Sequence, residues 1–353
     1  MEYFIKAIFL LSLLFIYSCS SPEKTGDRLL PIPNEINNDT ENKIAFLNKV
    51  IEEEDPQPEY FFHRAKLYLQ VNKSSAALRD INRAINLNPY GTSFYYYKAL
   101  ALKLEGNYEE ALIAIQQAKE NGFQNVDQNI LSGELFLIQG DTVNALNNLK
   151  EGFKSAPENY SVSFNLGKIY AGNLDTLNAM KFLNKAIKIA PSEISTYNEA
   201  MRILLKKGNF SYALNYAKRG LENSNPDPSF SYLFGETLES IGNIDSAAYW
   251  YSDSYKQEPV NWQPNFKLGQ YYSNKREFVK AQKFFSQATK TNPKLKEGFT
   301  ELGRINEYYL GKFDSAKTFY ELALALDSAD AKLPFYIRRV ERKLEFQRFS
   351  TEF

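Results

Sequence analysis

The chain has 353 residues, enough for two or three ordinary domains or for one elongated repeat array. It carries 42 basic and 42 acidic residues, and this zero formal charge argues against nucleic acid or an anionic membrane surface as the partner. With only 17 glycines and 14 prolines, the composition favours a folded, helical protein over a disordered one.

The first 18 residues have the pattern of a cleaved signal peptide. Lys6 precedes an apolar run over residues 7–16. This run has the length of a signal-peptide core and is too short for a membrane span, which needs ~20 apolar residues. The sequence therefore predicts export from the cytoplasm.

Cys19, the only cysteine, follows this run directly. With Ile16 three positions before it and Ser18 immediately before it, the segment resembles a bacterial lipobox. The resemblance implies cleavage before Cys19, a diacylglyceryl thioether on its sulfur and an acylated amino terminus, which together form a stable membrane anchor. Ordinary secretion is the alternative.

The residues after Cys19 bear on its destination. Ser20 stands where an aspartate retains enterobacterial lipoproteins in the inner membrane, so the resemblance implies the outer membrane. The following segment lacks a dense acidic run, which favours the periplasmic face, with the cell surface as the alternative. Residues 19–41 are polar and proline-containing, and we expect a flexible tether with an end-to-end distance of roughly 25 Å.

A capping helix is predicted over residues 42–57, because Ile44, Leu47 and Ile51 form an apolar stripe at helical spacing. A second is predicted over residues 331–353 from a similar stripe, Ile337, Val340 and Leu344.

Between these helices the chain repeats with a period of 34 residues. An alanine recurs at this interval, with one extra residue before the last member: Ala77, Ala111, Ala145, Ala179, Ala213, Ala247, Ala281 and Ala316. Small residues also precede each alanine by twelve or thirteen positions, except at Met201. The spacing predicts two helices per period, with small residues where the two backbones cross and a short turn between them, often Gly-Asn or Gly-Asp.

This pattern resembles the tetratricopeptide repeat, and it covers residues 58–330 as eight repeats that begin at 58, 92, 126, 160, 194, 228, 262 and 296. The resemblance implies an all-α fold, a right-handed superhelix (α-solenoid) of about eight helix–turn–helix repeats closed by a capping helix at each end. In the eighth repeat the extra residue lies between Gly303 and Gly311, and we expect a bulge or a lengthened turn there.

No motif in the sequence points to catalysis. His63 is the only histidine, which excludes a histidine pair, and Cys19 is taken up by the proposed anchor. There is no glycine-rich phosphate loop after a strand, and although paired carboxylates stay open, nothing points to them. We expect no enzyme activity, no metal and no cofactor.

Tetratricopeptide arrays resemble one another in lining a concave groove with the first helix of each repeat. Carried over to this sequence, the fifth, sixth and ninth positions of the repeats give candidate groove residues. They are Phe62, His63, Lys66, Tyr96, Tyr97, Phe164, Asn165, Lys168, Asn198, Arg202, Tyr232, Glu236, Phe266 and Lys267. The aromatic residues at the fifth position could equally pack within the array.

Three adjacent tyrosines in the second repeat illustrate this choice. Tyr95 occupies the fourth position, where the family prefers a core aromatic, and Tyr96 occupies the fifth, where packing and recognition compete. Tyr97 occupies the sixth position, where the fold supplies no evident reason for a large ring. We therefore expect Tyr95 to pack in the core and Tyr97 to be available to a partner.

The sequence thus predicts a non-catalytic, lipid-anchored scaffold that binds peptide segments or partner helices of envelope proteins, in an assembly or secretion complex. The Asn-, Lys- and aromatic-rich composition fits a Bacteroidota source. The alternative is a glycan-binding outer-membrane lipoprotein of a nutrient-uptake system. Oligomeric state is not predicted.

Overall fold

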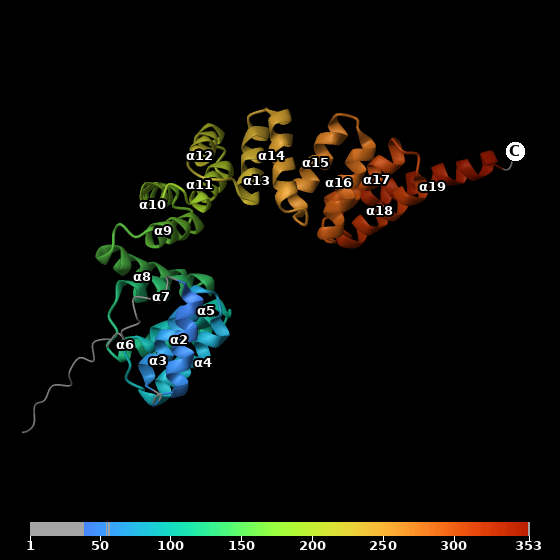
Figure 1. Ribbon diagram of the computed structural model, residues 1–353. Coiled ribbons are helices and arrows are strands. Elements are labelled where there is room, and N and C mark those ends of the chain that lie inside the picture. Colours follow the sequence, from blue (N-terminus) through green and yellow to red (C-terminus); the bar gives the residue numbers. More distant parts are fainter. Residues whose placement is uncertain (1–38, 54, 56, 352–353) are drawn as a thin grey trace, which may run out of the picture. The chain divides into compact units, whose positions relative to one another are not determined.

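The computed structural model describes residues 39–53, 55 and 57–351, and within these residues it is all-helical (Figure 1). The proposed signal peptide, Cys19 and most of the tether lie outside the described residues. None of the described helices is both long and apolar enough to cross a membrane. The helices are α2 (Thr40–Glu53), α3 (Pro58–Gln70), α4 (Ser74–Leu87), α5 (Phe94–Leu104), α6 (Tyr108–Glu120), α7 (Val126–Ile138), α8 (Thr142–Ser155), α9 (Tyr160–Gly172), α10 (Thr176–Ile189), α11 (Ile194–Lys206), α12 (Phe210–Asn223), α13 (Pro228–Ser240), α14 (Ile244–Gln257), α15 (Trp262–Asn274), α16 (Phe278–Thr291), α17 (Lys296–Tyr308), α18 (Phe313–Leu326) and α19 (Lys332–Thr351).

Helices α3 to α18 form eight antiparallel pairs, which confirms the predicted fold class. The odd-numbered helix of each pair is called here its first helix and the even-numbered one its second helix. Each pair is joined by a turn with one residue in the left-handed region, at φ between 55° and 84°. These residues are Asn72, Gly106, Gly140, Leu174, Gly208, Gly242, Arg276 and Gly311. Glycine holds this conformation without a Cβ clash, whereas Leu174 and Arg276 hold it under strain.

The predicted small residues lie where the two helices of a pair cross. A Cβ added at Gly133, Gly167, Gly235, Gly269 or Gly303 would lie 2.5 to 2.8 Å from a side chain of the second helix. The opposing side chains are Leu149, Leu183, Tyr251, Phe285 and Tyr320, respectively. The large residue therefore occupies the space that the small residue leaves open.

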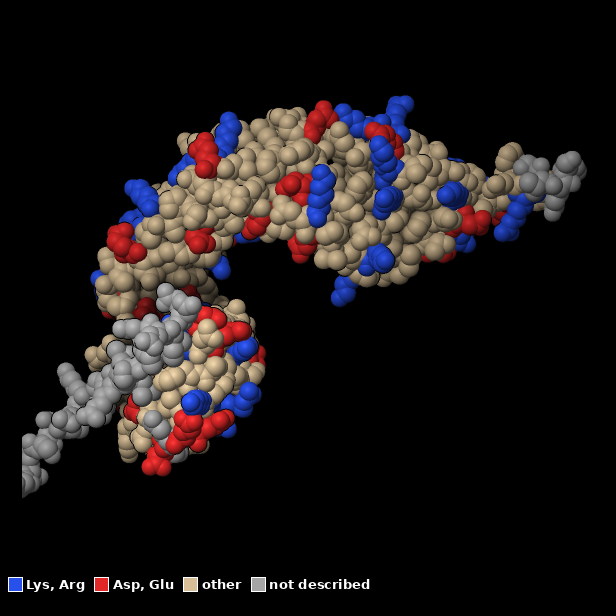
Figure 2. Space-filling model, viewed as in Figure 1, with Lys and Arg blue, Asp and Glu red and all other residues tan. Residues whose placement is uncertain are grey.

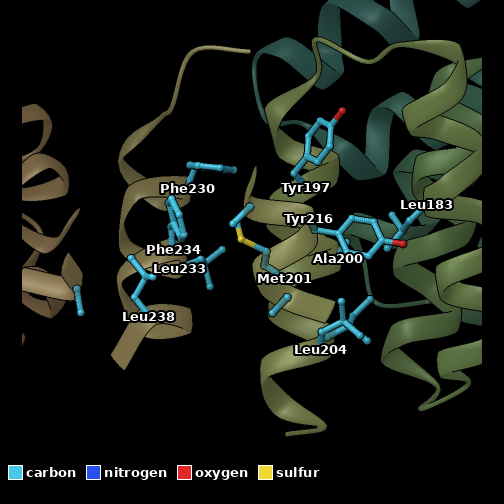
Figure 3. Close-up of a cluster of buried hydrophobic side chains, with 14 of the residues drawn as sticks. Leu183, Tyr197, Ala200, Met201, Leu204, Tyr216, Phe230, Leu233, Phe234 and Leu238 are labelled. Carbon is cyan, nitrogen blue, oxygen red and sulfur yellow. The ribbon is translucent and has the colours of Figure 1, made fainter. Parts of the chain in front are cut away.

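Met201, the one large residue in the small series, is explained by an exchange of volume. The residue that opposes it in the repeat pattern is Ala217, and both are 0 % exposed. Figure 3 shows the Met201 side chain on α11 pointing toward Leu233 and Phe234 of α13. The large side chain has moved to the first helix, and the small one to the second.

The described chain divides into two compact units, here called the N-terminal half (to Ser155) and the C-terminal half (from Ala156). The boundary falls between α8 and α9, which are the end of the third repeat and the start of the fourth. The sequence carries no mark of this division, because the spacing from Ala145 to Ala179 is the regular 34 residues. Each half is described separately below.

Helix α2 covers the first repeat, two residues ahead of the predicted start and ending at Glu53. Its Leu47 is fully buried and Ile44 nearly so. A buried ion pair also holds it: Arg64 donates to both Asp80 carboxylate oxygens, at 2.6 and 2.8 Å, and to Asn48 Oδ1 of α2 at 2.8 Å. The side chain of Asp80 is only 4 % exposed, so this pair anchors the cap through a desolvated contact.

Helix α19 covers the eighth repeat in the same way. Val340 is fully buried, with Ile337 and Leu344 packed beside it. Arg339 and Lys343 donate to the Glu307 carboxylate of α17 at 2.7 and 2.9 Å, and Tyr320 donates to it at 3.0 Å. Burial would raise the pKa of Glu307, but these donors outweigh it and hold the pKa below its ordinary value.

The extra residue of the eighth repeat lies in the turn. Helix α17 has the same 13 residues as most first helices, and four residues, 309–312, separate it from α18. The backbone N–H of Lys312 bonds to the carbonyl oxygen of Asn306 at 2.9 Å, which closes the longer turn. The predicted irregularity is therefore a lengthened turn.

Candidate protein-interaction face

The predicted groove residues all lie on first helices, and these helices adjoin one another. Contacts join α3 to α5 and α5 to α7 in the N-terminal half, and α9 to α11 and α11 to α13 in the C-terminal half. The surface that these first helices present is called here the first-helix face. It exists separately in each half.

In the N-terminal half, this face carries a connected set of aromatic rings. Tyr97 meets the rings of Phe62 and Tyr96 edge-on, with centroids 5.1 and 5.3 Å apart. Tyr96 in turn stacks on Phe123 at 5.0 Å. Lys66 extends over Phe62 and Tyr97, 5.6 and 5.4 Å from their centroids, which places a cation on the rim of an aromatic surface.

Two of the tyrosine predictions are corrected by these contacts. Helix α5 begins at Phe94, and it is Phe94, 5 % exposed and 4.7 Å from the Phe62 ring, that supplies the core aromatic, whereas Tyr95 is only half-buried. Tyr97 packs against two core clusters, so the fold does assign it a structural role. Tyr96 is also partly buried, and burial, followed by the charge of Asp127, raises the pKa of its hydroxyl.

Three candidates are too buried to meet a ligand in this conformation. Phe62 is 2 % exposed, Asn198 6 % and Asn165 8 %. The Asn198 amide donates to both carboxylate oxygens of Asp227 at 3.1 and 3.2 Å, and Asp227 accepts from the backbone N–H of Phe230 at the start of α13. Asn198 thus fixes the position of the next repeat and is not a recognition residue.

Two exposed cations stand on adjacent first helices of the C-terminal half. Lys168 of α9 lies over the Phe164 ring at 5.6 Å, and that ring stacks on Tyr160 at 5.6 Å. Arg202 of α11 pairs with Glu199 at 2.5 Å. Of the predicted residues, Lys168 and Arg202 are the most accessible, and His63 is half-buried on α3.

Farther along the C-terminal half, the face becomes a polar network between α13 and α15. Tyr232 donates to Glu236 at 2.8 Å, and Tyr251 and Lys267 donate to Glu239 at 2.6 and 2.7 Å. Burial, and then the adjacent carboxylates, raise the pKa of both tyrosine hydroxyls, which stay protonated as donors. Phe266, also on α15, is half-buried and meets Phe285 edge-on at 5.5 Å.

The sequence comparison missed the twelfth position of the repeat, which links neighbouring first helices. Four of its members are polar, and each meets the next first helix or the terminal cap. The pairs are Lys103–Glu134 at 2.5 Å, Glu239–Lys267 at 2.7 Å, Ser273–Arg304 at 3.2 Å and Glu307–Arg339 at 2.7 Å. Aligning the twelfth residues, as was done for the fifth, sixth and ninth, would have revealed the set.

Metal binding finds no support in the described part of the chain, where no three His, Cys, Asp or Glu side chains are grouped to hold an ion. On the side of the molecule seen in Figure 2, Lys and Arg are interspersed with Asp and Glu over the C-terminal half. The surface chemistry of this side is therefore of mixed charge.

Two family models described as "Tetratricopeptide repeat" match the sequence, one at residues 62–125 and 199–261 and the other at 160–193 and 298–330. Together they cover more than half of the chain. The chain belongs to the tetratricopeptide repeat (TPR) family. TPR domains generally bind peptides or partner proteins, and membership of this family indicates a protein-interaction scaffold.

Solved TPR-like structures share the fold at low sequence identity. Pseudomonas aeruginosa pilF is 12 % identical, with a TM-score of 0.54 over 62 % of this chain and 97 % of that one. The Cut9–Hcn1 hetero-tetramer of the APC/C is 13 % identical, with a TM-score of 0.54 over 85 % and 59 %. Human IFIT1, solved as a dimer with PPP-AAAA, is 18 % identical, with a TM-score of 0.51 over 82 % and 69 %.

Proposed function

We propose that this TPR protein is a non-catalytic scaffold that binds extended peptide segments or partner helices on its first-helix face. The observation that carries the proposal is the alternation on that face of half-buried rings and accessible charges of both signs. Lys66 beside Tyr97 and Lys168 beside Phe164 are two such combinations. Protein side chains supply both the apolar groups and the opposite charges that such a surface would bind.

The scaffold acts at a membrane, anchored through lipidated Cys19 in the outer membrane and facing the periplasm. The lipobox-like segment supports this part of the proposal. A short tether after Cys19 would keep the repeats near the membrane, which suits an assembly or secretion complex of the cell envelope. Mass spectrometry of the mature amino terminus tests the anchor: we expect a triacylated Cys19, and an unmodified cysteine would refute it.

Partner binding is tested with matched charge reversals. The double variant Lys168→Glu/Arg202→Glu changes two exposed residues on the first helices α9 and α11. The control, Lys188→Glu/Lys218→Glu, makes the same charge change at exposed positions on the second helices α10 and α12. Both variants should fold, because all four side chains are exposed.

Affinity isolation from solubilised envelopes, followed by quantitative mass spectrometry, provides the readout. We expect the wild type and the control to retain an envelope protein that the first-helix variant loses by about tenfold or more. An equal loss in both variants, or no enriched envelope protein with the wild type, would contradict the proposal.

A further inference from the structure

A hollow in the N-terminal half lies away from the first-helix face. It has a volume of about 660 Å³ and is lined by the second helices α6 and α8 together with α7. Its walls are apolar, from Leu112, Ile115 and Phe136, and its polar lining is dominated by uncharged side chains. Lys119 and Glu120 are the charged members of the lining.

Two buried polar side chains of α7 line this hollow. Gln128 is 6 % exposed and Ser132, one turn further along the helix, is 8 % exposed. Within the described part of the chain, neither the Gln128 carboxamide nor the Ser132 hydroxyl has a hydrogen-bond partner. Burying such groups without a partner is costly, so their presence in the wall needs an explanation.

The repeat architecture does not require polar residues at these two places. Gln128 is the third residue of its repeat, where Phe94 and Val162 are buried in the neighbouring repeats. Ser132 is the seventh, where Leu166 is buried in the next repeat. Apolar residues thus suffice for the fold, and the polar pair is a local departure that opens into the hollow.

The rim adds further carboxamides. Gln116 of α6 donates to Glu120 at 2.9 Å, and Asn148 of α8 donates to the carbonyl oxygen of Asn144 at 2.9 Å. Each of these amides keeps its own oxygen as an acceptor toward the hollow. The hollow therefore presents donors and acceptors of neutral character above apolar walls.

We propose that this hollow binds an extended polypeptide segment with uncharged side chains, as a second site separate from the first-helix face. A carboxamide offers one N–H donor and one carbonyl acceptor to a peptide group, which is the pairing that Gln128 lacks within the chain. The aliphatic walls suit a small apolar side chain beside that peptide group. Sugar rings favour flat aromatic platforms, and here Phe136 is the single aromatic among the lining residues.

The test uses peptides from a phage-displayed random dodecapeptide library, selected on the full-length chain and counter-selected on Gln128→Leu. We expect selected peptides to be poor in charged residues and to bind Gln128→Leu and Ser132→Ala about tenfold more weakly than the wild type. The first-helix variant Lys168→Glu/Arg202→Glu should leave their affinity unchanged, which separates this site from the proposed function.

A stability measurement distinguishes ligand recognition from structural support. If Gln128 serves a ligand, Gln128→Leu should raise the melting temperature, because leucine resembles the apolar residues at the same place in other repeats. A lower melting temperature for Gln128→Leu would overturn the proposal. Failure to select any peptide that discriminates Gln128→Leu, or binding of chito-oligosaccharides that this variant abolishes, would also overturn it.

Discussion

The exchange of volume at Met201 and Ala217 can be reversed by mutation. In the first two repeats, the crossing is built from Ala65 with Ile81 and from Ala99 with Ile115. The double variant Met201→Ala/Ala217→Ile would recreate that arrangement in the fifth repeat. Each single change should harm the fold, and the second change should repair the first.

The magnitudes follow from the complete burial of both residues. Met201→Ala removes a large side chain that is 0 % exposed, and its cost should be about 3 kcal/mol. Ala217→Ile adds three carbon atoms to a site that is also 0 % exposed, and overpacking should cost about 2 kcal/mol. Because the inserted isoleucine fills the space that methionine vacates, the double variant should lie within about 1 kcal/mol of the wild type.

Hydrogen exchange measured by mass spectrometry resolves this locally, which matters because long repeat arrays need not unfold as one unit. Peptides from α11 to α13 should lose protection in both single variants and regain it in the double variant. Peptides from α3 and α4, in the N-terminal half, are the internal control. Additive losses in the double variant would refute the volume-exchange explanation.

Three further predictions address strain, charge and aromatic packing. Leu174→Gly should raise stability by about 1 kcal/mol, because Leu174 has φ 62° and is 65 % exposed, while Gly208→Leu should lower it; urea unfolding of both variants checks this. Glu307→Gln should destabilise α19 by about 3 kcal/mol at pH 7. Since the folded-state pKa of Glu307 is lowered, its contribution is full above the ordinary carboxyl pKa of about 4.3 and is lost as the pH falls through the folded value. Proteolysis of α19 should therefore differ between variant and wild type at pH 7 and converge in acid; a constant difference would argue against the pair. Tyr97→Ala should cost about 2 kcal/mol, whereas Tyr97→Phe keeps the ring contacts and should melt like the wild type.

Spacing in the sequence predicted the helix pairs, the small crossing residues, both caps and the irregular eighth repeat. These features depend on local period and on residue size, which a single chain displays directly. It could not predict which helix of a pair supplies the volume at a crossing, because Met201 has meaning only beside Ala217. The same limit applies to Tyr95 and Phe94, since the start of α5 decides which ring enters the core.

The candidate site was harder to derive than the fold. The repeat phase placed all fourteen residues on first helices, but burial depends on neighbours that the phase does not specify. Asn198 is taken up by Asp227 from the following repeat, and Tyr97 by Phe62 from the preceding one. The hollow at Gln128 was detectable as a polar residue at a position otherwise buried and apolar, but the notable residues were sought on the first-helix face.

The central claim, that a polypeptide partner occupies the first-helix face, is tested most directly by site-specific photocrosslinking in cells. A benzoylphenylalanine replaces Lys168 on α9 in one strain and Leu177, 82 % exposed on the second helix α10, in the other. We predict a discrete crosslinked protein at position 168 that is absent at position 177. Equal crosslinking at both positions, or crosslinking only at 177, would contradict the account.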